Sequence, residues 1–227
     1  MDKNMNEFSL NFSVLALAHG LLITVFITIG ASLVAVVLGL IAGLIRVSSL
    51  WPLRWLAVAY IEFFRGTSLL VQVYLLFFVL PFFGVALSPW AVAIFGIGMN
   101  YSAYFAEVVR AAIQAVDRGQ YEASTALNFP RLTMMRRIVV PQAIRSMLPP
   151  SGNLLIELLK STSLVFFITI TEFTTASKLA ADATGNYLLF FAVALFGYYF
   201  IARALITPLV RRLERRLSSG FVREALA

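Results

Sequence analysis

The segment YEASTALNFPRLTMMRRIVVPQAI (Tyr121–Ile144) is a polar stretch, with one acid and three arginines, that lies between two long apolar segments. The preceding segment, Pro89–Val116, and the following one, Met147–Ile170, are both long enough to cross a bilayer, which takes about 20 residues of helix. The polar stretch is therefore predicted to connect two membrane-spanning helices. The side of the membrane on which it lies then fixes the topology of the chain.

The composition of the whole chain is that of an integral membrane protein. Of its 227 residues 60% are hydrophobic and 13% are charged, against about 45–50% and about 25% in soluble domains. We interpret the net charge of +7 as a topological signal rather than a nucleic-acid footprint. The chain has no cysteine and one histidine, His19, so the sequence offers no metal site and no set of catalytic residues.

The apolar segments predict an all-α protein with one transmembrane domain over residues 1–227. They are too long for barrel strands and do not alternate between apolar and polar residues. The predicted spans cover approximately residues 20–45, 55–82, 89–116, 147–170 and 187–210, and the polar connection covers residues 119–144.

The basic residues are distributed unequally between the connections. Twelve basic residues lie in the loop after the first span, in the loop after the third span or in the C-terminal tail. On the other side of the membrane there are two, Lys3 and Lys178. Basic residues accumulate on the cytoplasmic side of a membrane. We therefore expect the N-terminus outside and the C-terminus in the cytoplasm, and the Tyr121–Ile144 stretch is predicted to be cytoplasmic.

This cytoplasmic stretch has the pattern of two short helices joined by a turn. Tyr121–Leu127 and Arg131–Ala143 are predicted to be helical, with Asn128-Phe129-Pro130 between them. Asparagine tolerates the left-handed conformation that ends helices, and proline suits the first turn of the next helix. Such an elbow is explained either by an amphipathic surface in the lipid interface or by a docking site for a partner.

Three charged pairs lie inside the predicted spans, where ionisable residues are costly and often functional. They are Glu62 with Arg65, Glu107 with Arg110, and Glu157 with Lys160, each pair three residues apart on one helix face. We expect the first two to hold helices together. For the third, a structural role and a functional one stay open, because Pro149-Pro150 is expected to break the helix beside it.

Polar residues near this third pair are candidates for a substrate path. Asn100 and Tyr104 share a face of the third span, although both are also suited to hydrogen bonding with a neighbouring helix. The candidates are Asn100, Tyr104, Asn153, Leu154, Glu157, Lys160, Ser161, Thr162 and Ser163. Separately, small residues at Ala35, Gly39 and Gly43 predict a close helix contact.

The elbow residues also match a known motif. Glu122-Ala123-Ser124, three residues, Asn128, nine residues, and Ile138-Val139-Val140-Pro141 resemble the EAA loop of ABC importer permeases, Glu-Ala-Ala, three residues, Gly, nine residues, Ile, one residue, Leu-Pro. The departures are serine for alanine, asparagine for glycine and valine for leucine. The resemblance implies ATPase-coupling roles for Glu122, Ala123, Asn128, Arg131, Ile138 and Pro141.

The resemblance covers nearly the whole chain and points to the polar amino-acid branch of these permeases, with a type I importer fold in the bacterial inner membrane. It rests on FFRGTSLLVQVYLLFF (Phe63–Phe78), YSAYFAEVVRAAIQAVDRGQYEA (Tyr101–Ala123) and VVPQAIRSMLPPSGNLLIELLKSTSL (Val139–Leu164). It implies a cytoplasmic ATPase dimer that holds ATP and Mg²⁺, a second permease subunit, and an extracytoplasmic binding protein docked on Pro81–Ser88 and Glu172–Asn186. The chain itself has no Gly-x-x-x-x-Gly-Lys-Ser/Thr motif, so no cofactor is expected in it.

The substrate class follows from two positions of the same resemblance. Many relatives carry acids where this chain has Leu154 and Ser161, and the loss of both disfavours a cationic substrate. We therefore expect a neutral or anionic polar amino acid or a related zwitterion. The alternatives are a secondary transporter driven by an ion gradient and a membrane enzyme; the elbow disfavours the first and the absence of a nucleophile–base set disfavours the second.

Overall fold

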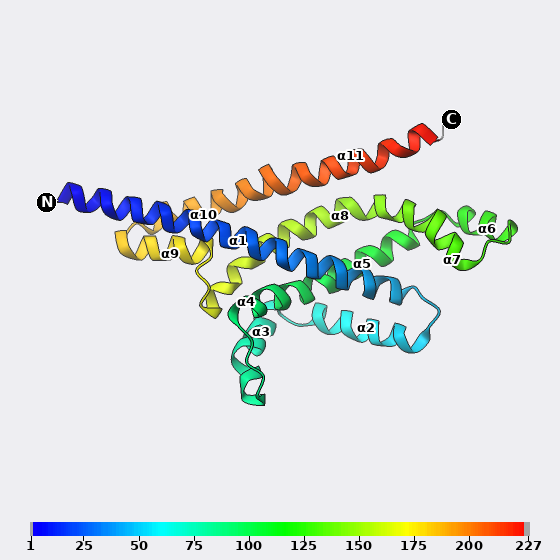
Figure 1. Cartoon of the computed structure of the whole chain (residues 1–227), viewed down its shortest axis with the longest axis horizontal. Coiled ribbons are helices and arrows are strands. Elements are labelled where there is room, and N and C mark those ends of the chain that lie inside the picture. Colours follow the sequence, from blue (N-terminus) through cyan, green and yellow to red (C-terminus); the bar gives the residue numbers. More distant parts are fainter. Residues whose placement is uncertain (1, 225–227) are drawn as a thin grey trace.

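The computed structural model describes the backbone of residues 2–224 and the side chains of residues 14–216. Within that range the chain consists of helices joined by short turns and contains no strand (Figure 1). The α-helices are α1 (Asp2–Arg46), α2 (Trp51–Gly66), α3 (Leu69–Tyr74), α4 (Pro89–Ala91), α5 (Ile97–Gln114), α6 (Arg118–Ala126), α7 (Arg131–Met134), α8 (Val140–Ser161), α9 (Phe173–Thr184), α10 (Tyr187–Ile201) and α11 (Thr207–Glu224). Short π or 3-10 turns extend several of them, at Leu75–Val79, Leu80–Phe83, Val92–Gly96, Met135–Val139, Thr162–Ile168 and Ala202–Ile206.

Four helical segments of the described chain are long and apolar enough to cross a membrane, and a bent pair supplies a fifth if it counts as one span. The four are Val14–Arg46, Pro89–Gln114, Arg131–Ile168 and Tyr187–Arg216. The prediction of an all-α, multi-pass membrane protein is therefore confirmed.

The second predicted span, residues 55–82, is not one straight helix. Helix α2 and the segment Leu69–Phe83 meet at an angle of 102°. The two residues between them, Thr67 and Ser68, are extended, with φ and ψ of −119° and 152°, and of −68° and 130°. Glycine at position 66 weakens the end of α2. The Thr67 hydroxyl donates to the Phe63 carbonyl at 2.7 Å and so gives a hydrogen-bond donor to one backbone carbonyl in the last turn of α2.

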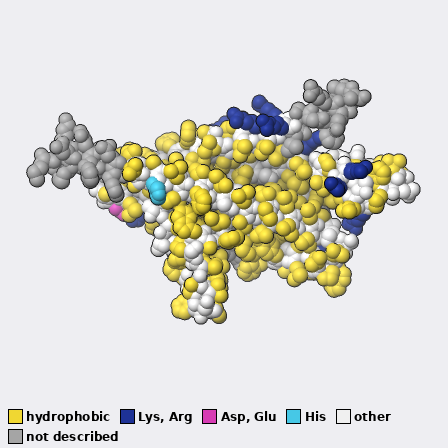
Figure 2. All heavy atoms as spheres, viewed as in Figure 1, with side chains coloured by type: hydrophobic (Ala, Val, Ile, Leu, Met, Phe, Trp, Pro, Cys, Tyr) yellow, Lys and Arg dark blue, Asp and Glu magenta, His cyan; other side chains and the backbone are white. Residues whose placement is uncertain are grey.

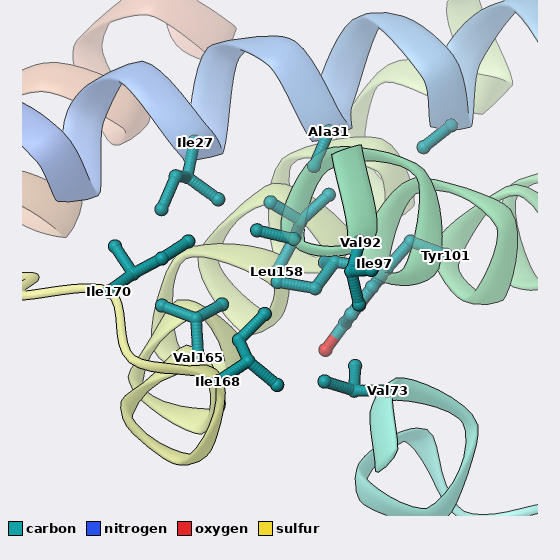
Figure 3. Close-up of a cluster of buried hydrophobic side chains, with 12 residues drawn as sticks. Ile27, Ala31, Val73, Val92, Ile97, Tyr101, Leu158, Val165, Ile168 and Ile170 are labelled. Atoms are coloured by element: carbon teal, nitrogen blue, oxygen red, sulfur yellow. The ribbon is translucent and has the colours of Figure 1, made fainter. Parts of the chain in front are cut away.

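Helix α1 lies directly against α5, and small residues make the contact possible. A Cβ atom at Gly39 would lie 2.8 Å from the Ser102 carbonyl oxygen, and one at Gly43 would lie 2.7 Å from the Val109 side chain. The predicted small-residue contact is therefore confirmed. Beside it, side chains from five parts of the chain form the main apolar core (Figure 3): Ile27, Ala31, Val73, Ile97, Tyr101, Leu158, Val165 and Ile168 are among its members.

The break predicted at Pro149-Pro150 is wrong, because both prolines lie inside the uninterrupted helix α8. Hydroxyl groups beside them donate to carbonyls of the preceding turns, Ser146 to Ala143 at 3.3 Å and Ser151 to Met147 at 2.5 Å. Serine hydroxyls of this kind help a membrane helix to tolerate proline. The helix changes character later, where Thr162–Ile168 tightens into a 3-10 turn.

The arginine-bearing connections gather at one end of the molecule. The turn after α1, the elbow of α6 and α7, and the C-terminal part of α11 lie at the right of Figure 1, whereas α9 and the N-terminus lie at the left. The space-filling view shows basic side chains toward the same end (Figure 2). The predicted orientation requires this arrangement. Lys3 and Arg223, which entered the charge count, lie outside the described side chains.

Candidate substrate cavity and coupling elbow

A polar cavity of about 450 Å³ lies where the α2–α3 break faces α5 and α8. Its walls combine backbone at the break with hydroxyl, amide and carboxylate side chains. The lining residues are Thr67, Ser68, Leu69, Leu70, Asn100, Tyr101, Tyr104, Glu157, Ser161 and Leu164. A concave site with a few convergent polar groups is the usual form of a small-molecule site.

An amide network holds the break open beside the cavity. The Asn100 side-chain nitrogen donates to the Phe64 carbonyl at 3.0 Å and to the Gln72 side-chain oxygen at 3.1 Å. The Gln72 nitrogen in turn donates to the Thr67 hydroxyl at 2.6 Å. Asn100 thus both lines the cavity and bonds to the neighbouring helix, so the two readings offered for it are compatible.

Two tyrosines of α5 form one wall. The hydroxyl groups of Tyr101 and Ser161 are 2.7 Å apart, which joins α5 to α8. The ring of Tyr104 lies under the guanidinium of Arg65, with 5.4 Å from the guanidinium carbon to the ring centroid. Such a cation–π contact stabilises the cation where water is scarce.

Glu157 is the one lining residue of the cavity with a carboxylate, and no lining residue is basic. Among the described side chains it forms no ion pair, so the predicted Glu157–Lys160 pair is wrong. The reason is that Lys160 lines a different groove, between α8 and α10. Three residues of helix turn a side chain by about 60° from its neighbour, enough to separate two grooves.

The structure brings four of the nine predicted path residues to the cavity: Asn100, Tyr104, Glu157 and Ser161. The other five lie elsewhere: Asn153 is exposed on α8, Leu154 packs against the core, Thr162 is buried with its hydroxyl on the Leu159 carbonyl, and Lys160 and Ser163 line the second groove. Sequence reasoning missed Thr67, Ser68 and Tyr101. The Gly-Thr-Ser triplet inside an apolar run was the available signal for the first two.

The charged pairs at the other end of the spans form one cluster centred on Glu107. Its carboxylate lies 2.6 Å from Arg46, 2.9 Å from Arg110 and 3.9 Å from Arg65. The Glu107–Arg110 pair is confirmed. The Glu62–Arg65 pair is not formed, because Glu62 lies nearest to Arg46, at 3.8 Å, and Arg65 turns toward Glu107. The cluster ties α1, α2 and α5 together.

The elbow folds as two helices with a left-handed turn at Asn128, where φ is 52°. The Asn128 amide donates to the Thr125 carbonyl at 2.9 Å, and the Phe129 amide donates to the Ser124 carbonyl at 3.0 Å. This is the hydrogen-bond pattern that glycine normally closes at a helix end. Asparagine therefore fulfils the geometric role of the motif's glycine.

The first elbow helix, α6, has one anchored face and one free face. Tyr121 donates its hydroxyl to the Ile113 carbonyl of α5 at 3.0 Å, and desolvation by burial raises the pKa of the Tyr121 phenol above its ordinary value. Ser124 is buried, while Glu122 and Ala123 are exposed on the same helix. The face that carries Glu122 is thus accessible to a partner.

The second elbow helix is longer than predicted. Arg131 begins α7, which runs through a π turn into α8 without a gap. Arg131 is exposed, Ile138 is partly buried, and Pro141 lies in the first turn of α8. The elbow is therefore continuous with the helix that carries Glu157.

The predicted outer docking segment, Glu172–Asn186, begins in the interior. Glu172 is fully buried, and its carboxylate accepts hydrogen bonds from the amides of Thr174 and Thr175 at 2.8 and 2.9 Å and from the Tyr198 hydroxyl at 2.7 Å. The carboxylate caps α9 and joins it to α10. For Glu172 a docking role is therefore wrong, and the exposed surface lies at the far end of α9.

Comparison with known proteins agrees with this fold. Residues 35–219 match the family described as binding-protein-dependent transport system inner membrane component. Over 202 residues the chain is 35% identical to the L-cystine transport system permease protein of Bacillus subtilis, covering 88% of this chain and 86% of that one. It is 33% identical over 203 residues to the arginine transport system permease protein of the same species, covering 89% and 92%.

Two solved structures are similar. The crystal structure of an amino acid ABC transporter with histidines superposes with a TM-score of 0.85 at 33% identity, over 92% of this chain and 97% of that one. A methionine ABC transporter in an inward-facing conformation shares the fold, with a TM-score of 0.73 at 18% identity, over 89% and 96%. The chain therefore belongs to the binding-protein-dependent transport system inner membrane components, multi-pass proteins of the bacterial inner membrane, and within them to the permease subunits of amino-acid ABC importers.

Proposed function

We propose that this permease carries a neutral or anionic polar amino acid, or a related zwitterion, through the cavity between the α2–α3 break, α5 and α8. The relatives do not settle the substrate, since their names include both L-cystine and arginine. The observation that carries the proposal is the cavity's charge: one carboxylate, Glu157, with no ion pair to a described side chain. Among the proposed substrates, this single carboxylate favours a neutral zwitterionic amino acid, because one carboxylate of the cavity matches the one ammonium group of the substrate.

The rest of the cavity suits the other end of an amino acid. The hydroxyls of Tyr101 and Ser161, and the backbone freed at Thr67-Ser68, are hydrogen-bonding groups of the kind that hold a substrate carboxylate at a broken membrane helix. Ser161 lines the cavity with a hydroxyl, so the substrate carboxylate meets a hydrogen-bonding group there instead of a like charge. A cationic side chain would find no second acid among the lining residues.

Uptake by the complete transporter in proteoliposomes tests the substrate class. Neutral polar amino acids are expected to compete for uptake at much lower concentrations than arginine or histidine. Glu157→Gln is expected to weaken substrate binding, while Thr28→Ala on α1, outside the cavity, leaves uptake unchanged. Tight, ATP-dependent uptake of arginine or histidine would refute the assignment.

The coupling part of the proposal concerns the elbow. Its exposed face, with Glu122, docks on a cytoplasmic ATPase dimer that holds ATP and Mg²⁺; Asn128 shapes the turn and Pro141 starts the helix that leads to the cavity. The continuity of α7 with α8 supports the transmission of ATPase closure to Glu157. The ATPase activity then resides in the partner, a second permease subunit completes the path, and a binding protein docks on Pro81–Ser88 and the far end of α9.

Co-purification with the ATPase tests the coupling role. Glu122→Ala is expected to reduce, and Glu122→Lys to abolish, retention of the ATPase on the tagged permease. Asp182→Ala, on α9 at the other end of the molecule, serves as the control and retains it. Unchanged retention in both Glu122 variants, or uptake that follows an ion gradient without ATPase, would contradict the proposal.

A further inference from the structure

The groove between α8 and α10, which we call the α8–α10 groove, has a volume of about 690 Å³ and is separate from the substrate cavity. Two cations, Lys160 from α8 and Arg203 from the turn after α10, line it, and no lining residue is an acid. Both side chains are exposed, and neither lies within 4.0 Å of a carboxylate on residues 14–216. The described part of the chain therefore leaves the positive charge of this groove unbalanced.

Lys160 and Arg203 lie at nearly the same depth along the groove. A Cβ atom at Gly152 would lie 2.9 Å from the Val210 side chain, so these residues of α8 and α11 are level. From that level α8 runs forward, and α10 backward, toward the same end of the molecule (Figure 1). At about 1.5 Å per residue, Lys160 lies about 12 Å and Arg203 about 10 Å away from it. Two like charges at one depth repel each other where water is scarce, so an anion between them is favourable.

The position of Arg203 along α10 places its guanidinium within reach of lipid headgroups. At the start of α10, Tyr187 donates its hydroxyl to Asp182 at 2.8 Å, and Asp182 pairs with Lys178 at 2.7 Å on an exposed surface. An aromatic residue beside exposed charges is typical of a membrane–water interface. From Tyr187 to Arg203 the helix rises about 24 Å, in a hydrocarbon core about 30 Å thick. Long cationic side chains extend toward the nearer interface, which here is that of the arginine-bearing connections.

The groove changes from charged to apolar as it runs deeper into the membrane. Thr207 lines it on the headgroup side of Arg203, at the end of the π turn Ala202–Ile206. Phe191 and Leu195 line it on the other side, toward the start of α10, and both are exposed. A phospholipid has the same order, with a charged phosphate at the membrane edge and apolar chains that extend inward.

We propose that the α8–α10 groove binds an anionic phospholipid, with its phosphate between Lys160 and Arg203 and one acyl chain along Phe191 and Leu195. In the predicted orientation this lipid belongs to the cytoplasmic leaflet, and basic pockets between helices on that side are suited to anionic headgroups. A small polar amino acid fits the groove less well, because it would leave the exposed apolar side chains uncovered. Glu157 takes no part in this site, so the carboxylate of the substrate cavity stays available.

Native mass spectrometry of the complete transporter in mild detergent tests the lipid binding. The probes are phosphatidylglycerol and phosphatidylcholine of equal chain length, and we expect the wild type to bind the first more tightly. Lys160→Gln and Arg203→Gln are each expected to weaken phosphatidylglycerol binding about fivefold, whereas Arg203→Lys keeps the charge and most of the binding. Arg54→Gln, at an exposed arginine of α2 outside the groove, is the matched control and should bind as the wild type does. Equal binding of the two lipids, or equal binding by the wild type and both glutamine variants, overturns the inference.

Thermal unfolding distinguishes a lipid phosphate from a free anion. Phosphatidylglycerol is expected to raise the unfolding midpoint of the wild-type transporter, and to raise it much less in the double variant Lys160→Gln/Arg203→Gln. Inorganic phosphate at the same concentration should leave the midpoint unchanged. A rise with inorganic phosphate as large as that with the lipid would identify a site for free anions and overturn the assignment to a phospholipid.

A single thiol tests whether lipid or protein covers the groove. The chain has no cysteine, so Leu195→Cys introduces one thiol on the exposed apolar side of the groove. In membranes that contain the complete transporter, a short bis-maleimide is expected to join this thiol to no other protein chain, because lipid covers it. Efficient cross-linking to another subunit would mean that protein occupies the groove, against the inference. None of these measurements uses substrate, so they test the lipid site independently of the proposed function.

Discussion

The side-chain nitrogen of Asn100, on α5, donates a hydrogen bond of 3.1 Å to the side-chain oxygen of Gln72, on the helix that follows the α2–α3 break. Both side chains are almost fully buried, with 4% and 7% of their surface exposed. Because the same nitrogen also reaches the Phe64 carbonyl before the break, one residue of α5 holds both sides of the bend. The shape of the cavity therefore depends on a contact between segments that are distant in the chain.

Asn100→Ala removes the donor to the buried Gln72 side-chain oxygen, whereas the Phe64 carbonyl keeps a donor in the Gln72 side-chain nitrogen. A buried acceptor left without a donor costs about 1–3 kcal/mol, so the midpoint of thermal unfolding in detergent should fall, and substrate binding should fall with it. Thr171→Ala, at an exposed residue for which the structure shows no side-chain hydrogen bond, should change stability by less than about 0.5 kcal/mol. Equal effects of the two substitutions would contradict the bracing role.

Glu107→Gln removes the centre of the arginine cluster. Its side chain is 17% exposed and that of Arg46 is 20% exposed, so the loss should approach the lower end of the range for breaking a buried ion pair, about 3 kcal/mol. Glu62→Gln is the matched control: Glu62 is 62% exposed and lies 3.8 Å from Arg46, so about 0–1 kcal/mol is expected. Denaturation of the two variants in parallel would reveal whether the cluster is centred on Glu107.

Asn128→Ala tests the elbow turn. At φ 52° a residue with a Cβ and no local hydrogen-bonding side chain costs about 1–2 kcal/mol, whereas Asn128→Gly should be neutral or slightly stabilising. Leu127→Ala, one residue earlier at φ −83° and with its side chain exposed, controls for a general effect of truncation. Among the three variants, we expect amide hydrogen exchange at the elbow to increase only in Asn128→Ala. Protection that is equal in the alanine and glycine variants would count against a strained turn.

Gly39→Ala tests the contact between α1 and α5. The added Cβ would lie 2.8 Å from the Ser102 carbonyl oxygen, a backbone atom, so the two helices must move apart. Overpacking of this kind typically costs about 1–3 kcal/mol. Leu40→Ala, the neighbouring residue on the exposed side of α1, should cost much less. The measurement is the midpoint of thermal unfolding of each variant in detergent. A Gly39→Ala variant as stable as the wild type would mean that α1 and α5 do not touch at Gly39.

The sequence was sufficient for those features that depend on local pattern. Long apolar runs predict helices that cross a membrane because the bilayer leaves no other way to satisfy the backbone. Asn128-Phe129-Pro130 predicts a turn because its residue types restrict φ locally, and the turn is there. Ala35, Gly39 and Gly43 predict a close contact because only small residues allow backbones to approach, although the pattern does not name α5 as the neighbour.

The tertiary structure alone decided where each charge and each break lies. Spacing along a helix predicts that Glu157 pairs with Lys160 and that Glu62 pairs with Arg65. In the structure Glu157 and Lys160 face different cavities. Arg65 turns toward Glu107 on a neighbouring helix, where three arginines converge. Pro149 and Pro150 stay helical where nearby serines support the backbone, whereas Thr67 and Ser68 break because Asn100 and Gln72 hold the bend. Residue types set what each segment is able to do, and the packing of distant segments selected among those possibilities.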